Sequence, residues 1–390
     1  MKRKRLIALT AVLALSISMF AGCGSSDTKD SKDAKEKGYE IALITDKGNI
    51  DDKSFNQGAW EGVIKFAEEN DITNKYYKPE EASDAGYYAQ IELAITGGAK
   101  VVVTPGFLFE VPVYEAQTKY PDVKFILLDG APHTADYSAF ETKENTASVK
   151  YAEAQSGYLA GYAAVKDGMT KLGFMGGMAV PAVQGFGYGY LQGAEAAATE
   201  LGLADGAISV TYHYTGDFAE TDTNKATAKT MYQEGTEVIF ACGGSVGKSV
   251  MAAADEAGKK VIGVDVDQRY DSETVVTSAT KGLGASVISV LDSIYNTDSW
   301  ADFGGKTTVF NAANDGVGLP TAVIGDESAD AFDRFTSFTK ADYEAVYKTL
   351  ADGSVDPVGT FDVADSNGYA SDEELTTNLN LAKVSVKTRQ

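Results

Sequence analysis

The feature that most constrains the fold of this chain is a regular alternation of short apolar runs with longer segments of helical periodicity. The apolar runs are rich in β-branched residues, as at residues 171–176 and 260–265. The segments between them repeat apolar side chains every three or four positions, as at residues 55–70. Strands that alternate with helices in this way form parallel sheets covered by helices on both faces. The sequence therefore predicts an α/β protein with doubly wound parallel sheets.

The alternation also predicts how the chain divides. It continues past about residue 150 without a wide Gly/Pro-rich linker, and one core would be unusually large for 390 residues. We therefore expect two similar α/β lobes joined by short crossovers, as a hinged binding protein needs. The predicted strands are residues 39–45, 100–104, 123–129, 171–176, 208–214, 237–241 and 260–265, and the predicted helices are residues 55–70, 89–95, 112–119, 152–165, 189–201, 224–234 and 247–257.

The start of the chain has the pattern of an export signal. Basic residues at 2–5 precede an apolar stretch at 6–19 that is too short to span a bilayer, and small residues then stand directly before Cys23. This pattern resembles the signal peptide of bacterial lipoproteins, so residues 1–22 are expected to be removed and Cys23 to be lipidated. Ordinary secretion is the alternative. Residues 23–38, in which Lys and Asp are interleaved, are expected to form a flexible tether on the extracytoplasmic face of the membrane.

Composition argues against several classes of function. The chain has 34 Lys and Arg against 56 Asp and Glu, a net charge of −22, which disfavours a nucleic-acid partner. Two His and two Cys leave little material for a zinc site or a histidine relay, so we expect no metal, no cofactor and no enzymatic activity. With Cys23 lipidated, Cys242 is expected to be a buried apolar side chain, and no disulfide is expected.

Acidic residues follow several of the predicted strands. Ligands of open α/β sheets bind beyond the carboxyl ends of the strands, and Asp46, Asp129 and Asp265 each stand at such an end. Lys281 ends a further short strand and adds one cation. Because ionised carboxylates accept strong hydrogen bonds from hydroxyl groups, this set is typical of a site for a neutral polyol. Asp51 and Asp52, in the same loop as Asp46, are instead expected to cap the following helix.

Aromatic side chains stand in the same loops. Phe55 and Asn56 begin the helix after the first strand, Phe186 lies in a Gly-rich turn before the helix expected at 189–201, and Phe218 follows the strand at 208–214. Two rings from opposite lobes can sandwich a flat ligand, and an amide beside one of them can hydrogen-bond to its edge. For Phe186 and Phe218 the alternative is a place in the core.

Three segments approach known motifs without matching them. Residues 242–249 nearly form a P-loop, but Cys242 takes the position of its first glycine. Residues 265–276 lack the Gly and Glu of a calcium loop, and the glycines at 187–193 do not have the spacing of a dinucleotide fingerprint. We interpret residues 242–249 as a strand, a glycine turn and the start of a helix.

Two motifs are specific enough to indicate a family. The pattern D-x-G-x-x-D-D-x-S-F-N-Q at residues 46–57 and the pattern G-V-D-x-D-Q at residues 263–268, together with the lipoprotein-type leader, resemble the basic membrane protein family of substrate-binding lipoproteins. The best-known members of that family are purine nucleoside receptors of ABC importers. The resemblance covers about residues 39–290. It implies a type I periplasmic-binding-protein fold, with two lobes joined by a three-stranded hinge that close on a ligand without chemistry.

The resemblance also implies how the base of a nucleoside is held. Phe55 and Phe218 would sandwich the purine from opposite lobes. The side chains of Asp46 and Asn56 would read the edge of the base.

The remaining implied contacts concern the ribose. Asp129, Asp265 and Lys281 would hold its hydroxyl groups, Gly243 would offer backbone contacts, and Phe186 would be a further pocket residue. Nucleosides are expected rather than nucleotides, because a phosphate would be repelled by the surplus of aspartates.

The expected organisation follows from these inferences. The first lobe is expected to take residues 39–149 plus about 276–325, and the second lobe residues 150–275 plus about 326–390. The protein is expected to be a monomeric, lipid-anchored binding component that delivers adenosine, guanosine or inosine to ABC permease subunits. The alternatives are a sugar or a flavin-like heterocycle as ligand, a sensor that signals to a membrane kinase, and a nucleoside or glycoside hydrolase.

Overall fold

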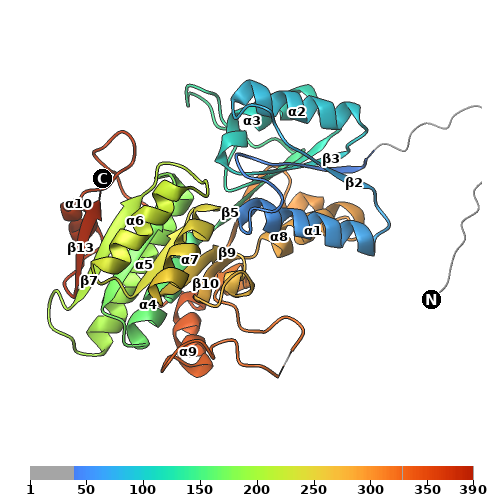
Figure 1. Ribbon diagram of the computed structural model, residues 1–390. Helices are drawn as coiled ribbons and strands as arrows, with labels where there is room; N and C mark the ends of the chain where they lie inside the picture. The colour runs from blue at the N-terminus through green and yellow to red at the C-terminus, as the bar shows by residue number, and fades with distance from the viewer. Residues whose placement is uncertain (1–38, 327, 390) are drawn as a thin grey trace, which may run out of the picture. The chain divides into compact units, whose positions relative to one another are not determined.

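The computed structural model describes residues 39–326 and 328–389 (Figure 1). The predicted signal peptide, Cys23 and the tether at residues 23–38 lie outside the described residues. Within the described part, no helix combines the length and apolar character needed to cross a membrane.

The first lobe is built on a six-stranded parallel sheet in the order β11-β5-β4-β3-β1-β2. Helices α1 and α8 pack against each other on one face of this sheet, and α2 and α3 cover the other face (Figure 1). The strands are β1 (Ile41–Ile44), β2 (Asn74–Tyr77), β3 (Val101–Pro105), β4 (Lys124–Leu128), β5 (Thr146–Tyr151) and β11 (Lys306–Phe310), and the helices are α1 (Phe55–Glu69), α2 (Asp84–Thr96), α3 (Glu110–Lys119) and α8 (Leu283–Tyr295).

The second lobe is built on a seven-stranded sheet in the order β12-β10-β9-β8-β6-β7-β13, in which only the short β12 pairs antiparallel. Helices α4 and α5 cover one face, and α6 and α7 cover the other. The strands are β6 (Lys171–Gly176), β7 (Ile208–Tyr214), β8 (Val238–Cys242), β9 (Lys260–Asp265), β10 (Val275–Lys281), β12 (Val317–Gly318) and β13 (Val384–Arg389), and the helices are α4 (Glu153–Lys166), α5 (Pro181–Glu200), α6 (Asp222–Gln233) and α7 (Val246–Ala257).

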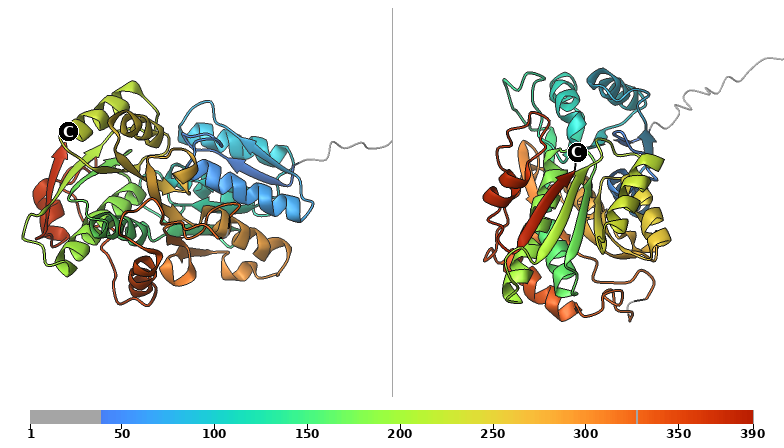
Figure 2. Two further views of the ribbon diagram at one scale, coloured as in Figure 1. Left: turned by 60° about the horizontal axis from the view of Figure 1, so that its bottom comes forward. Right: turned by 60° about the vertical axis from the view of Figure 1, so that its left-hand side comes forward.

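The C-terminal part of the chain belongs to the second lobe. Helix α9 (Lys340–Ala351) contacts α4, and α10 (Asp372–Asn378) packs beside β13. Strand β13 pairs in parallel with β7 and so forms the outer edge of the second sheet, as the views in Figure 2 show.

The chain crosses between the two sheets three times, after β5, after β10 and between β11 and β12. Two lobes joined by three crossovers are the architecture expected from the sequence. The boundaries differ from the expected ones, because Val275 to Thr280 pair with β9 of the second sheet. The chain therefore returns to the first lobe after Lys281 instead of at about residue 276, and it leaves that lobe again between Phe310 and Val317.

The glycine-rich segment at residues 183–190 is helical, which corrects the turn predicted there. Helix α5 begins at Pro181, eight residues before the predicted start at Gly189. A Cβ atom at Gly189 would overlap the carbonyl oxygen of Ala154 in α4. Gly189 therefore serves close packing between two helices, and Gly187 allows close packing of α5 on Tyr212 of β7.

Candidate ligand-binding site

A cleft of about 820 Å³, counting the space open to solvent, lies where the carboxyl ends of strands from both sheets meet. Every site residue predicted from the sequence lines it: Asp46, Phe55, Asn56, Asp129, Phe186, Phe218, Gly243, Asp265 and Lys281.

Asp46 stands directly beyond β1, and its carboxylate is held by its own loop. Oδ1 accepts the backbone N–H of Gly48 at 2.9 Å and the side-chain amide of Asn56 at 2.8 Å. Burial raises the pKa of Asp46, and these two hydrogen bonds lower it in part. The carboxyl group therefore takes up a proton more readily than an exposed aspartate does.

Both the nitrogen and the oxygen of the Asn56 side-chain amide make hydrogen bonds within this loop. Its nitrogen donates to Asp46 Oδ1 and to Asp52 Oδ2, each at 2.8 Å, and its oxygen accepts the backbone N–H of Asp46 at 3.1 Å. Asn56 thus positions Asp46, and its oxygen keeps one lone pair for a ligand. Asp52 also accepts the backbone N–H groups of Asn56 and Gln57, which confirms its predicted role as a cap of α1. The same prediction is wrong for Asp51, whose exposed carboxylate accepts from the side-chain amide of Asn49 at 2.8 Å.

Asp129 and Lys281 form an ion pair between the lobes. Asp129 follows β4 in a left-handed conformation with φ of 57°, and its Oδ2 accepts from Lys281 Nζ. Its Oδ1 is buried and has no hydrogen-bond partner among the described residues. A buried acceptor without a partner is costly, so this oxygen is well suited to receive a ligand hydroxyl.

Lys281 has a second anionic partner that sequence reasoning missed. Glu153, the first residue of α4, places Oε1 3.1 Å from Lys281 Nζ. Burial lowers the pKa of Lys281, but Asp129, Glu153 and Asp265 together outweigh it, and the net shift is upward. Burial also raises the pKa of Glu153, because the attraction of Lys281 offsets only part of the desolvation. No local pattern marks Glu153, since its role depends on a lysine far along the chain.

Asp265 ends β9 with φ of 66° and faces the first lobe. Its Oδ2 accepts from the hydroxyl of Ser54, the residue before α1. Burial raises the pKa of Asp265 to about 6, although Lys281 and Ser54 lower it. Its carboxylate belongs to the same electrostatic cluster as Asp129 and Lys281.

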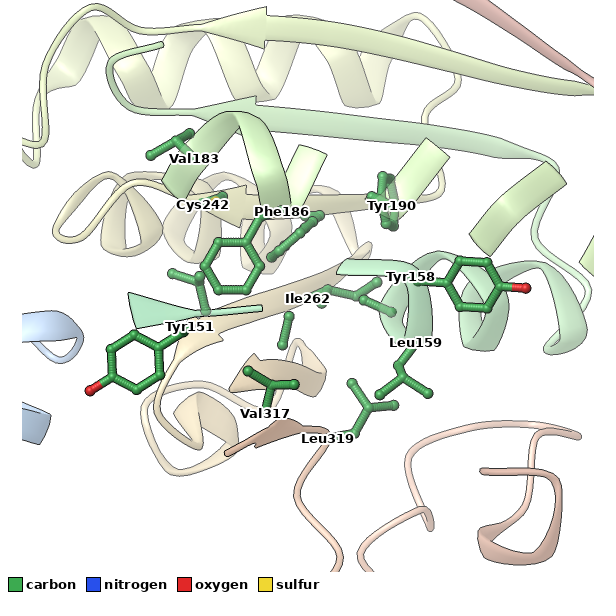
Figure 3. Close-up of a cluster of buried hydrophobic side chains, with 14 of the residues drawn as sticks. Tyr151, Tyr158, Leu159, Val183, Phe186, Tyr190, Cys242, Ile262, Val317 and Leu319 are labelled. Atoms are coloured by element: carbon green, nitrogen blue, oxygen red, sulfur yellow. The ribbon is translucent and has the colours of Figure 1, made fainter. Parts of the chain in front are cut away.

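The three phenylalanines differ in their surroundings. Phe55 and Phe218 are half-buried and come from opposite lobes, and Lys281 Nζ lies 5.0 Å from the centre of the Phe55 ring. The Phe218 ring lies against Gly177, where a Cβ atom would come within 2.5 Å of it. Phe186 is 2% exposed and packs edge-on against Phe240, within the cluster of Figure 3. Phe186 therefore belongs to the core and contributes only a small exposed area to the lining of the cleft.

Glycines bring the ends of β6 and β8 together. A Cβ atom at Gly243 would lie 2.9 Å from the backbone nitrogen of Gly177, and Gly244 has φ of 56°. Strand β8 ends at Cys242 and α7 begins at Val246, so the predicted strand, turn and helix start are confirmed. Cys242 is a buried free thiol, as expected.

Other lining residues were not predicted. Gly106 and Phe107 follow β3, and residues 180–183 begin α5. The rule that ligands bind beyond strand ends also covers Gly106 and Phe107, because Pro105 ends β3. The first turn of α5 had no such signal, because the helix was predicted to start only at Gly189.

Comparison with known proteins identifies the family. A family model described as ABC transporter substrate-binding protein PnrA-like matches residues 39–349. This chain belongs to that family. The membership confirms the resemblance to basic membrane proteins, and the family is one of substrate-binding proteins.

Individual relatives agree with this assignment. The ABC transporter nucleoside-binding protein BmpA of Lactococcus lactis subsp. cremoris is 32% identical over 340 residues, which cover 81% of this chain and 91% of the relative. Basic membrane protein D of Borreliella burgdorferi is 29% identical over 301 residues, 76% of this chain and 82% of that protein.

Solved structures share the fold. An ABC transporter solute-binding protein from Aeropyrum pernix superposes with a TM-score of 0.73 at 24% identity, over 88% of this chain and 99% of the other. One from Conexibacter woesei gives a TM-score of 0.64 at 22% identity, over 83% and 100%. The two parallel-sheet lobes thus form a periplasmic-binding-protein fold.

Proposed function

We propose that this protein is the lipid-anchored, extracytoplasmic binding component of an ABC importer, and that it holds a purine nucleoside between its lobes. The observation that carries the proposal is the convergence of Asp129, Asp265 and Lys281 from both lobes on a cleft that also contains Phe55 and Phe218.

The polar cluster suits a ribose ring. Two vicinal hydroxyl groups donate well to carboxylates, and hydrogen bonds to ionised oxygens are the strong ones. Asp129 Oδ1 is a buried acceptor without a partner among the described residues, and Lys281 supplies a donor held at its side. The pair offers both an acceptor and a donor to neighbouring hydroxyls.

The apolar and acidic part of the cleft suits a heterocyclic base. Rings from Phe55 and Phe218 offer flat faces from opposite lobes, and Asp46 offers a carboxyl group with a raised pKa beside them. The Lactococcus lactis relative is named as a nucleoside-binding protein, which supports the same ligand class here. Closure of the lobes on the ligand would present a defined surface to the permease.

Calorimetry on the purified protein tests the ligand class. We expect binding heat with adenosine, guanosine or inosine, and weaker or no heat with ribose or riboflavin. Absence of heat with every nucleoside, uridine included, would contradict the proposal. Binding of ribose or riboflavin alone would instead support one of the alternative ligands.

Two substitutions test the site. Asp129→Ala removes the unpartnered acceptor and should reduce affinity by roughly 2–4 kcal/mol. Phe55→Ala should weaken all bound nucleosides by a similar factor, because stacking on an aromatic ring is tolerant of base identity. Unchanged affinity in either variant would remove that residue from the site.

The membrane anchor has its own test. Metabolic labelling with palmitate should mark the wild-type protein in its native host or a bacterial expression host, and Cys23→Ser should abolish the label. Labelling that persists in the Cys23→Ser variant would contradict the predicted anchor.

A further inference from the structure

The two motifs that indicated the family contact each other across the lobes. Residues 51–54 of the first motif lie in the first lobe, before α1, and residues 265–268 of the second motif follow β9 in the second lobe. Four residues make the buried contacts, Lys53 and Ser54 on one side and Asp265 and Gln268 on the other. We call these four residues the inter-lobe clasp.

The clasp consists of two hydrogen bonds, one buried and one partly buried. Gln268 Nε2 donates to the backbone carbonyl of Lys53 at 2.7 Å, and the Ser54 hydroxyl donates to Asp265. Gln268 is 1% exposed and Ser54 is fully buried. Groups this well shielded from water lose more when a partner is removed than exposed groups do.

Gln268 is fixed within its own lobe before it reaches the other. Its Oε1 accepts the backbone N–H of Val264 at 3.0 Å, and its backbone N–H donates to the hydroxyl of Ser278 at 3.0 Å. Because both bonds lie in the second lobe, the amide nitrogen of Gln268 is held in place for the Lys53 carbonyl. Little side-chain entropy is then lost when the lobes meet.

Lys53 is held in an unusual backbone conformation at the same point. Its φ is 61°, in the left-handed region that residues with a Cβ atom rarely adopt. Such strain persists only where surrounding contacts enforce it. The side chain of Gln57 accepts the backbone N–H of Lys53 at 3.2 Å, and Gln268 binds its carbonyl. The bond to Gln57 lies within the first lobe, whereas the bond from Gln268 crosses between the lobes and therefore supports this conformation only while the lobes are together.

Three of the four clasp residues are separate from the ligand contacts. In the described part of the chain, the residues that line the cleft include Asp265 but not Lys53, Ser54 or Gln268. Two exposed contacts flank the clasp, an ion pair between Lys53 and Asp271 at 3.2 Å and a bond from Lys248 Nζ to the carbonyl of Asp51 at 3.4 Å. Exposed contacts of this kind contribute little, so the buried pair dominates.

We propose that Gln268 is a positioning residue that stabilises the closed form and slows ligand release without touching the ligand. The proposal rests on the proposed function, in which a nucleoside is held between the lobes. Apparent affinity falls in proportion to the fraction of protein in the binding-competent form, so a contact made only on closure strengthens binding of every ligand alike. Since the clasp forms after the lobes meet, its loss should act on the dissociation rate.

Gln268→Glu is the test variant. It keeps the acceptor for Val264 and nearly the same volume, and it removes the donor to Lys53. We expect the dissociation rate of adenosine, guanosine and inosine, measured by stopped-flow fluorescence on the full chain, to rise by about tenfold or more, the effect of one buried hydrogen bond. The association rate should stay within about threefold of wild type.

Gln117→Glu is the matched control. Gln117 is also 1% exposed, donates to a backbone carbonyl, that of Glu141, at 2.8 Å, and accepts the backbone N–H of Lys143 at 3.0 Å. All of these atoms lie in the first lobe. Gln117→Glu should therefore lower the melting temperature and leave the dissociation rate unchanged. Gln268→Met, which also removes the donor to Lys53 at similar volume and leaves Ser54 and Asp265 unchanged, provides a second test variant if Gln268→Glu does not fold.

The outcomes separate this inference from the proposed function. Equal dissociation rates in wild type and in the clasp variants would overturn the inference. If the wild type binds no nucleoside, the proposed function fails, and small-angle X-ray scattering then tests the clasp by itself. In that case the clasp variants should have a larger radius of gyration than wild type and Gln117→Glu, and equal radii would overturn the inference.

Discussion

At the scale of single residues, the site contains buried charges that are unfavourable for folding. Asp129, Glu153 and Asp265 surround one lysine, and burial raises the pKa values of Glu153 and Asp265. A carboxylate that is charged in a buried place destabilises the fold that contains it. Sites that bind or catalyse often trade stability in this way, so removing the charge of Glu153 or Asp265 should stabilise the ligand-free protein.

Asp265→Asn tests this cost. The pKa of Asp265 in the folded protein is about 6, against an ordinary value of 3.8, so the folded state binds more protons between these pH values. Its contribution to the free energy of unfolding therefore falls as pH rises through this window, by at most about 3 kcal/mol. In urea denaturation at pH 7 the variant should be more stable than wild type by roughly 1–3 kcal/mol, and near pH 4 the gain should be small. An equal gain at both pH values would assign the effect to packing instead of charge.

The same scale shows what a sequence can predict about a site. Asp46, Asp129 and Asp265 were predicted because each directly follows a buried strand, and parallel strands bring their carboxyl ends to one edge. The place of Glu153 in the site and the positioning role of Asn56 were not predicted, because each depends on side chains that only the fold brings together. Local position thus identifies the lining of a cleft better than the network behind it.

At the scale of elements, glycines decide how closely two helices pack. Cβ atoms at Gly157 and Gly161 of α4 would overlap carbonyl oxygens of α5, and Cβ atoms at Gly189 and Gly193 of α5 would overlap carbonyl oxygens of α4. These reciprocal contacts place the backbones of α4 and α5 against each other. The first turn of α5 lines the cleft, so this packing also sets the position of one wall.

Gly193→Ala tests this packing, with Gly247→Ala as its control. A methyl group at Gly193 would overlap the carbonyl of Tyr158, and backbone atoms cannot rotate away, so we expect a loss of about 3 kcal/mol or more. Gly247 is also buried in a helix, α7, but its nearest neighbours would be 3.8 Å away. Alanine there should be neutral or stabilising by up to about 1 kcal/mol. Thermal and urea denaturation of both variants measure the difference, and equal effects would contradict the argument.

Elements near the end of the chain were the least predictable. Strand β13 pairs along its length with β7 and completes the second sheet, yet only every second residue in its first part is buried. The family model ends at residue 349, before this strand. Edge strands carry a weak sequence signal because one side of the strand and one face remain open to water. The central strands of the described sheets, most of them buried on both faces, were all predicted except β5.

At the scale of the whole molecule, charge bears on ligand choice. The chain carries a net charge of −22, and the cleft lining contains four aspartates, Asp46, Asp52, Asp129 and Asp265, against two lysines, Lys47 and Lys281. A field of this sign repels anions at long range and, at a few ångströms, costs several kcal/mol per unpaired charge in a protein environment. The long-range repulsion does not affect a neutral nucleoside, whereas it weakens the binding of a nucleotide, which carries a charged phosphate.

Adenosine and adenosine 5′-monophosphate therefore should bind very differently if the proposed function holds. We expect the monophosphate to bind at least about a hundredfold more weakly, because its phosphate enters a cleft with a surplus of carboxylates. Affinities are measured by calorimetry at low salt and at about 1 M salt, where the Debye length is about 3 Å. High salt should reduce the difference in affinity between the two ligands without abolishing it, because salt screens the distant charges but not those in contact. The neutral 5′-O-methyladenosine controls for size and should show no salt dependence. Equal affinity for the nucleoside and its monophosphate would show that Asp129 and Asp265 do not surround the sugar, and the assignment of the ribose end of the cleft would be wrong.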